Sequence, residues 1–241
     1  MKGKFVGMNL KSKYLIIILA VIIIKINFSI NVKAEEYSRF NNISIEDGLS
    51  QATVETMMQD SKGYIWLGTN DGLDRYNGYT FKKYTYEKGK KNSLVNGYIL
   101  DIKEDDEGNI WVATAIGISK IYNDGETVQN YTSDSESGNL SNDNTCIILI
   151  SSSNKIYVGT AEGINLYDKK TDKFNLIYPE LKEEYINSLT EDKYGNIWAG
   201  TENGLYKINV DTNVIERFES TDDVNTISEN YIYKVYYDGD K

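Results

Sequence analysis

Short runs of strand-forming residues, separated by tight turns, occupy the chain from residue 35 onward. The run Ile65–Thr69 follows Asp60-Ser61-Lys62-Gly63 and precedes Asn70-Asp71-Gly72. Asp at the first and Gly at the fourth position are typical of a β-turn, and Asn-Asp-Gly is a strong hairpin signal. This pattern predicts short antiparallel strands joined by tight turns.

The same pattern occurs four times, with cores at residues 63–73, 108–118, 154–164 and 195–205. An Ile stands four residues before the threonine of each core, and an aromatic residue stands three before it: Trp66, Trp111, Tyr157 and Trp198. The threonines, spaced by 45, 46 and 41 residues, are Thr69, Thr114, Thr160 and Thr201. A period of this length is typical of one propeller blade.

Apolar runs before and after each core complete a predicted set of four strands. First strands are expected at residues 54–59, 98–103, 145–150 and 185–190, and return strands at 73–76, 118–122, 164–167 and 205–208. Fourth strands are expected, for example, at residues 80–84 and 214–218. The prediction is an all-β fold: an incomplete β-propeller over residues 35–241, with about four four-stranded blades and the start of a fifth at 231–241. A β-sandwich also has many short strands, but it has no reason to repeat its turn chemistry at a fixed period.

The first 34 residues have a different pattern. Lys2, Lys4, Lys11 and Lys13 precede the apolar run Tyr14–Ile24, and Val32-Lys33-Ala34 provides a small-residue cleavage site. This order predicts a signal peptide cleaved after Ala34, with an uncleaved N-terminal membrane anchor as the alternative. Both interpretations place residue 35 onward outside the cytoplasm, so the protein is expected to be extracellular or at the cell surface.

Charge and composition narrow the possible functions. Loss of residues 1–34, which hold six lysines and no acid, would take the net charge from −10 to −16. So acidic a surface repels phosphate backbones and argues against nucleic acid as a partner. The chain has no His, the commonest general base and metal ligand, and its single Cys146 lies in an apolar run that favours a buried, inert thiol. We therefore predict no catalytic residues, no metal site and no cofactor.

Several features with possible chemistry also have structural explanations. Trp66, Trp111 and Trp198 occupy one repeat position, which favours a core role over sugar stacking. The acids at 105–107 and 222–223 are expected in surface turns, and the Asp-x-x-Gly turns lack the further oxygen ligands of a calcium loop. Tyrosines near the end of the chain favour an ordinary strand whose partner is missing over a binding face: Tyr231, Tyr233, Tyr236 and Tyr237.

Ligands of propellers commonly bind at loops between strands, and the longest polar loops are expected at residues 88–97, 133–144 and 220–230. The sequence does not identify which residues contact a ligand.

The motif Gly-x-Ile-Trp-x-Gly-Thr-x-x-Gly-Leu resembles the two-component regulator propeller repeat, as does the lead-in at 40–51 with its Gly48-Leu49-Ser50. Departures from the repeat are Ala113 and Ile116 in the second copy, and Asn154 and Tyr157 in the third. The resemblance implies an exported sensor region of a signalling receptor. Its output domain would be a cytoplasmic histidine kinase, hybrid regulator or diguanylate cyclase outside this chain, and its ligand, by family analogy, an oligosaccharide.

The alternative function is a secreted propeller that acts only in protein–protein contacts. In propellers of this kind the last blade is often completed by an N-terminal strand, and residues 37–44 resemble such a strand. An incomplete ring would also expose sheet edges that favour self-association. Membrane attachment would come only from residues 1–34 or from a downstream helix outside the chain.

Overall fold

The computed structural model describes residues 42–134 and 139–239. Residues 1–34, where the sequence predicts a signal peptide or anchor, lie outside this description, as do residues 37–41 of the predicted N-terminal strand. At the end of that stretch, Ser44 is the N-cap of the short 3-10 helix η1 (Ile45–Asp47). Within the described ranges, no helix has the length and apolar character needed to cross a membrane.

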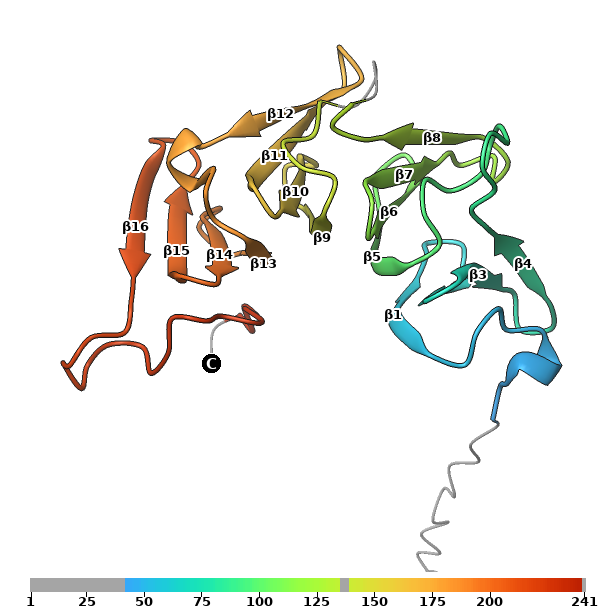
Figure 1. Cartoon of the computed structure of the whole chain (residues 1–241), viewed down its shortest axis with the longest axis horizontal. Helices are drawn as coiled ribbons and strands as arrows, with labels where there is room; N and C mark the ends of the chain where they lie inside the picture. The colour runs from blue at the N-terminus through green and yellow to red at the C-terminus, as the bar shows by residue number, and fades with distance from the viewer. Residues whose placement is uncertain (1–41, 135–138, 240–241) are drawn as a thin grey trace, which may run out of the picture. The chain divides into compact units, whose positions relative to one another are not determined.

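The described residues form four antiparallel sheets of four strands, and each sheet keeps its strands in chain order (Figure 1). We number these sheets as blades 1 to 4. Blade 1 contains β1 (Val54–Gln59), β2 (Ile65–Thr69), β3 (Gly72–Tyr76) and β4 (Phe81–Tyr84), and blade 2 contains β5 (Ile99–Glu104), β6 (Ile110–Thr114), β7 (Ile118–Ile121) and β8 (Val128–Tyr131). Blade 3 contains β9 (Thr145–Ile150), β10 (Ile156–Thr160), β11 (Gly163–Asp168) and β12 (Lys173–Ile177). After η2 (Pro179–Leu181), blade 4 contains β13 (Ile186–Glu191), β14 (Ile197–Thr201), β15 (Gly204–Asn209) and β16 (Val214–Phe218).

These elements confirm the predicted all-β propeller architecture. The strands predicted at 54–59, 145–150 and 214–218 have the predicted bounds, and the strand predicted at 98–103 lies one residue later. The first strands β1, β5, β9 and β13 contact one another in succession, so the sheets follow one another side by side instead of forming two facing layers. This arrangement is that of propeller blades and differs from the β-sandwich alternative.

The threonine of each repeat holds the hairpin that follows it. The Thr69 hydroxyl donates to the backbone carbonyl of Gly72 at 2.8 Å and accepts from the Asp71 amide at 3.1 Å. The same pair of bonds recurs at the other threonines: Thr114, Thr160 and Thr201. All four threonines are fully buried, so their hydroxyls satisfy backbone groups that water cannot reach.

The hydrophobic core lies between consecutive blades. Trp66 and Leu73 of blade 1 pack in one cluster with Ile102 and Ile110 of blade 2. Close approach of the blades explains the Gly before the repeat threonine, because a Cβ at Gly68 would come within 2.6 Å of the Ile99 side chain. Equivalent clusters join blades 2 and 3 and blades 3 and 4. Each blade therefore buries its apolar face against the next one.

A buried leucine precedes each first strand, at Leu49, Leu94, Leu140 and Leu181. Beside three of these leucines, a backbone amide donates to a buried polar side chain on the third strand. Ser50 donates to Asp74 at 2.7 Å, Val95 to Ser119 at 2.9 Å and Ser141 to Asn165 at 2.9 Å. The Gly48-Leu49-Ser50 segment is therefore part of the repeat itself, and it attaches the lead-in to blade 1.

Residues 231–238 lie where the first strand of a fifth blade would lie. The Val235 amide donates to Ser188 Oγ at 3.0 Å, as the Ile148 amide donates to Asp101 Oδ2 at 2.9 Å between blades 2 and 3. A Cβ at Gly200 would meet Ile232 at 2.7 Å. Residues 231–238 form no strand because a first strand pairs with the second strand of its own blade, and no described strand occupies that place.

Candidate functional site

A β-bulge interrupts the first strand of every blade at the same place. The register with the second strand skips one residue, and the four residues left out of the pairing are Glu55, Leu100, Cys146 and Asn187. A bulge bends its strand and turns the extra side chain away from the sheet, and bulges are common beside functional sites. Each first strand therefore has one residue outside the strand pairing, and these residues lie on the same side of the four blades.

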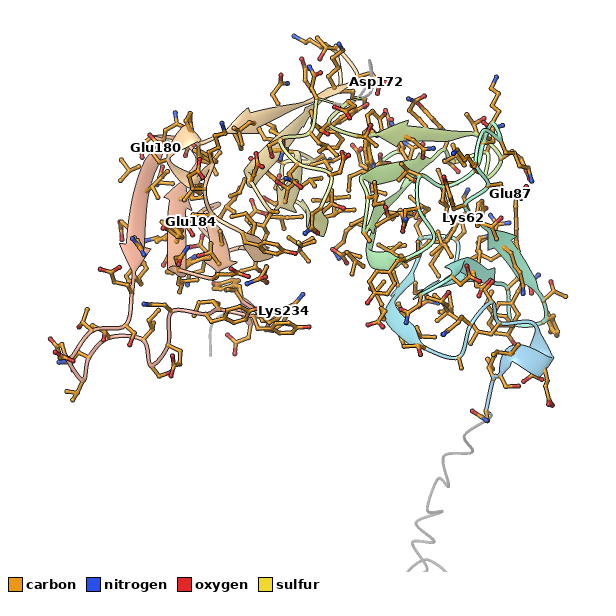
Figure 2. All side chains as sticks on the ribbon, viewed as in Figure 1. Lys62, Glu87, Asp172, Glu180, Glu184 and Lys234 are labelled. Carbon is orange, nitrogen blue, oxygen red and sulfur yellow. The ribbon has the colours of Figure 1, made fainter. Side chains whose placement is uncertain are left out.

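These four residues line one cavity of about 520 Å³, which we call the axial cavity. Tyr233, which holds the equivalent position on the C-terminal segment, also lines it. The remaining wall contains the rings of Tyr185 and Tyr231 and the Glu202 side chain. Lys234 comes from the C-terminal segment, where Figure 2 labels it. The volume is within the range of about 300–1,000 Å³ that is usual for small-molecule sites.

The walls of the axial cavity combine aromatic faces with mixed charge. Asp101 is neutralised locally, because Lys103 Nζ lies 2.6 Å from its Oδ1 and the Ile148 amide donates to its other oxygen. Burial raises the pKa of Tyr185 to about 12, and a hydrogen bond with Cys146 acts in the same direction. Burial also raises the pKa of the Cys146 thiol. Both groups are therefore protonated at neutral pH, when they can take part in hydrogen bonds but not in nucleophilic attack.

The repeat tryptophans and the C-terminal tyrosines have different environments in the structure. Trp66 and Trp111 are buried, as predicted for a core role, and Trp198 is half-buried. Tyr231 and Tyr233 were predicted to belong to an ordinary strand, but their segment forms no strand and both residues line the axial cavity. The described residues of the predicted ligand loops at 88–97, 133–144 and 220–230 do not line it.

Sequence reasoning missed the cavity residues because a bulge leaves little trace in a single apolar run. Cys146 begins such a run and was predicted to be buried, but the bulge turns it toward the cavity and leaves it half-buried.

The acidic residues at 105–107 lie in a turn, as predicted, and the turn aspartate also accepts a hydrogen bond from the repeat tryptophan. Asp105 accepts from the backbone amides of Glu107 and Asn109 and from Trp111 Nε1 at 2.8 Å. Within the described residues, no cluster of three or more Cys, Asp or Glu side chains is arranged to hold a metal ion.

The sequence model of the family described as "Two component regulator propeller" matches residues 48–71, 93–115 and 180–203. Each matched segment begins one residue before the buried leucine and ends at the hairpin after the repeat threonine, in blades 1, 2 and 4. A relative described as Histidine kinase P4 of Formosa agariphila is 42% identical over 57 residues, which are 23% of this chain and 4% of that protein.

Two solved structures have a similar fold. The WD40 β-propeller domain of Doa1 matches 77% of this chain and 57% of its own, with 15% identity and a TM-score of 0.55. A catalytically inactive virginiamycin B lyase from Staphylococcus aureus matches 72% of this chain and 57% of its own, with 16% identity and a TM-score of 0.56. The chain thus spans less than two thirds of each of these proteins. At such identities the structures support the propeller fold alone, whereas the family model matches three of the four repeats. The chain carries repeats of the two-component regulator propeller family.

Proposed function

We propose that residues 35–241 are an exported sensor region of a two-component-type signalling receptor, and that its ligand binds in the axial cavity. Ligand binding would be signalled to a cytoplasmic output domain outside these 241 residues. The observation that carries the proposal is the recurring bulge, which directs one side chain from every first strand into one cavity.

Three further observations support a sensor role. The matched repeats belong to a family described as two-component regulators, and the sequence relative is described as a histidine kinase. The N-terminal pattern of lysines, apolar run and small residues favours export. The cavity holds no histidine, and its thiol and Tyr185 hydroxyl are protonated at neutral pH, which favours ligand binding over catalysis.

An oligosaccharide is the ligand class that we propose, by analogy with the family and from the chemistry of the wall. Sugar rings pack on aromatic faces and exchange many hydrogen bonds with amides and carboxylates. The cavity supplies tyrosine rings at 185, 231 and 233, together with the Asn187 amide and the Glu202 carboxylate. A second copy of the chain or a protein partner could instead bind at the face that holds the axial cavity, and this is the competing outcome.

Titration calorimetry with a panel of neutral oligosaccharides tests the binding site. The Tyr233→Ala variant removes an aromatic face whose side chain is 77% exposed, so it should leave the fold intact. We expect it to weaken binding roughly five- to tenfold, the equivalent of about 1 kcal/mol of aromatic contact. Tyr79→Ala, which removes a 91% exposed tyrosine of blade 1 away from the cavity, is the matched control and should not change affinity. Equal weakening by both variants would argue against the axial cavity.

The competing function is a secreted propeller used only for protein–protein contact. An immunoblot of source cells with an antibody against residues 35–241 distinguishes the two. A membrane-bound band far above 27.4 kDa is expected for a receptor, whereas a soluble band below that mass would favour the secreted module.

A further inference from the structure

Blades 1, 2 and 4 share a set of three side chains that blade 3 lacks. In these blades the indole N–H of the repeat tryptophan donates to the turn aspartate, at 2.7 Å for Trp66, 2.8 Å for Trp111 and 2.9 Å for Trp198. A cation on the neighbouring strand lies over each indole ring: Arg75 at 5.6 Å, Lys120 at 4.9 Å and Lys207 at 5.6 Å. The aspartate, indole and cation therefore form one interacting set.

Blade 3 replaces all three members at once. Ser151 stands in the place of the aspartate, Tyr157 in the place of the tryptophan, and Leu166 pairs with Tyr157 across the strands where the cation would be. A smaller ring and an aliphatic chain fill less of the space beside the next blade, and Leu166 places no cation opposite the ring.

The grooves between consecutive blades differ in size, and the largest lies beside blade 3. The groove between blades 1 and 2, which Trp66 and Arg75 line, has a volume of only about 10 Å³. The groove between blades 2 and 3, which Lys120 lines, has about 200 Å³. Between blades 3 and 4, where Tyr157 and Leu166 stand, the volume rises to about 370 Å³. We call this last space the lateral pocket.

A polar group without a partner lies in the wall of the lateral pocket. Tyr157 is 2% exposed, and its hydroxyl makes no hydrogen bond to any residue in the described part of the chain. None of the described side-chain polar atoms is both sealed from solvent and unpaired, so this hydroxyl retains access to the space that Tyr157 lines. A buried hydroxyl without a partner is destabilising unless water or a ligand satisfies it.

We propose that the lateral pocket binds a small, uncharged ring compound with one oxygen that exchanges a hydrogen bond with the Tyr157 hydroxyl. The apolar body of the ligand would rest on Leu166, Ile177 and Val210. This site is separate from the axial cavity, with which it shares no lining residue.

The rest of the wall supports this ligand class. Tyr178 and Pro179 follow β12 and add an aromatic face and an apolar ring, and Tyr178 holds a left-handed backbone with φ of 56°. At the mouth, exposed Lys155 and Glu180, the latter labelled in Figure 2, carry opposite charges. Their fields oppose each other, so neither a cation nor an anion is favoured over a neutral molecule.

Ligand-observed saturation-transfer NMR on the full chain tests the proposal, with p-cresol and toluene as probes. Both carry the same ring and methyl group, but only p-cresol has the oxygen. Tyr157→Phe removes one hydroxyl and keeps the ring, so p-cresol should bind about fivefold more weakly, the equivalent of one hydrogen bond of about 1 kcal/mol. Toluene binding should not change.

Two variants fill the lateral pocket in different ways, so the test still works if one of them fails to fold. Val210→Trp blocks the pocket from blade 4, and the triple change Ser151→Asp, Tyr157→Trp and Leu166→Lys rebuilds the set of the other blades. Each should reduce binding of both probes more than tenfold, while Tyr233→Ala in the axial cavity should leave it unchanged. The proposal is wrong if p-cresol fails to bind the wild type, if Tyr157→Phe binds it equally well, or if either folded filling variant retains full binding.

Discussion

Blade 2 and blade 3 share one strand pattern and differ in how they fill their interiors. In blade 2, Trp111 is fully buried, stacks on Tyr131 with ring centroids 5.8 Å apart and meets the edge of Tyr167 of blade 3 at 4.8 Å. In blade 3, Tyr157 sits at the equivalent position beside a cavity of about 370 Å³. The backbone pattern of a blade is therefore independent of its aromatic filling, so one blade can lose the shared set and still form all four strands.

Truncating the repeat aromatic should produce the largest difference between the two blades. We expect Trp111→Ala to lower the free energy of unfolding by about 3–5 kcal/mol, because it removes a fully buried ring and a hydrogen bond to Asp105. Tyr157→Ala should cost roughly 2–3 kcal/mol, since a cavity already borders that ring and its hydroxyl has no partner among the described residues. Urea denaturation of both variants measures the difference, and equal losses would contradict the comparison.

Removing the turn residue should have a smaller effect of the same kind. Asp105→Ala leaves two backbone amides and the Trp111 indole without their acceptor, and we expect a loss of about 2 kcal/mol. In blade 3, Ser151 Oγ accepts only the Lys155 amide and contacts Ser153, so Ser151→Ala should cost less than about 1 kcal/mol. The same urea titrations apply. A larger loss for Ser151→Ala would show that the blade 3 turn depends on its hydroxyl more than its contacts indicate.

Most of the blade architecture could be predicted from the sequence because each element has a local signal. Asn-Asp-Gly is a strong local signal for a hairpin, and the Ile-Trp run before it has the composition of a buried strand. The small residue at Gly68 is explained by the close approach of Ile99 from the next blade. Local chemistry repeated four times is easier to interpret than the same chemistry met once.

The sites were harder to predict because they depend on contacts between blades. The bulge at Cys146 is defined by the register against β10, which the apolar run does not reveal. The departures of blade 3 were visible at Tyr157, but the loss of the cation opposite it could be recognised only once the pairing of Tyr157 with Leu166 was known. Both the bulge at Cys146 and the missing cation opposite Tyr157 are properties of strand pairing, which a single sequence does not contain.

The close contact between blades gives a prediction that can be tested by compensation. A Cβ at Gly159 would lie 2.6 Å from Ile186 Cγ2, and Gly159→Ala should therefore destabilise the protein by about 1–3 kcal/mol. Blade 2 carries Ala113 at this position, and the strand that follows begins with the smaller Thr145 where blade 4 has Ile186. Adding Ile186→Thr to Gly159→Ala should recover part of the loss in thermal unfolding. If the losses of stability from the two substitutions simply add, the pair of Ala113 and Thr145 is not a model for the pair at positions 159 and 186.

The smallest expected effect is a difference in acid sensitivity between blades with and without the turn aspartate. Burial opposes ionisation of Asp192, but hydrogen bonds from Asn196 and Trp198 outweigh it and hold the pKa of this carboxyl below its usual value near 3.8. A carboxyl whose pKa is lowered by folding contributes stability above its unfolded pKa and loses it as the pH falls through the folded value.

Asp192→Ser, which gives blade 4 the turn residue of blade 3, should therefore lower the melting temperature at neutral pH. The gap from the wild type should narrow as the pH falls below about 4, because the wild type then loses the contribution that the variant never had. Glu229→Gln, a change at an exposed carboxyl in the loop after β16, is the matched control and should parallel the wild type at every pH. The difference in melting temperature between wild type and variant could instead stay constant from neutral pH to below about pH 3. Asp192 would then act through the shape of its turn alone, and the charge of its carboxylate would not contribute to the difference between the blades.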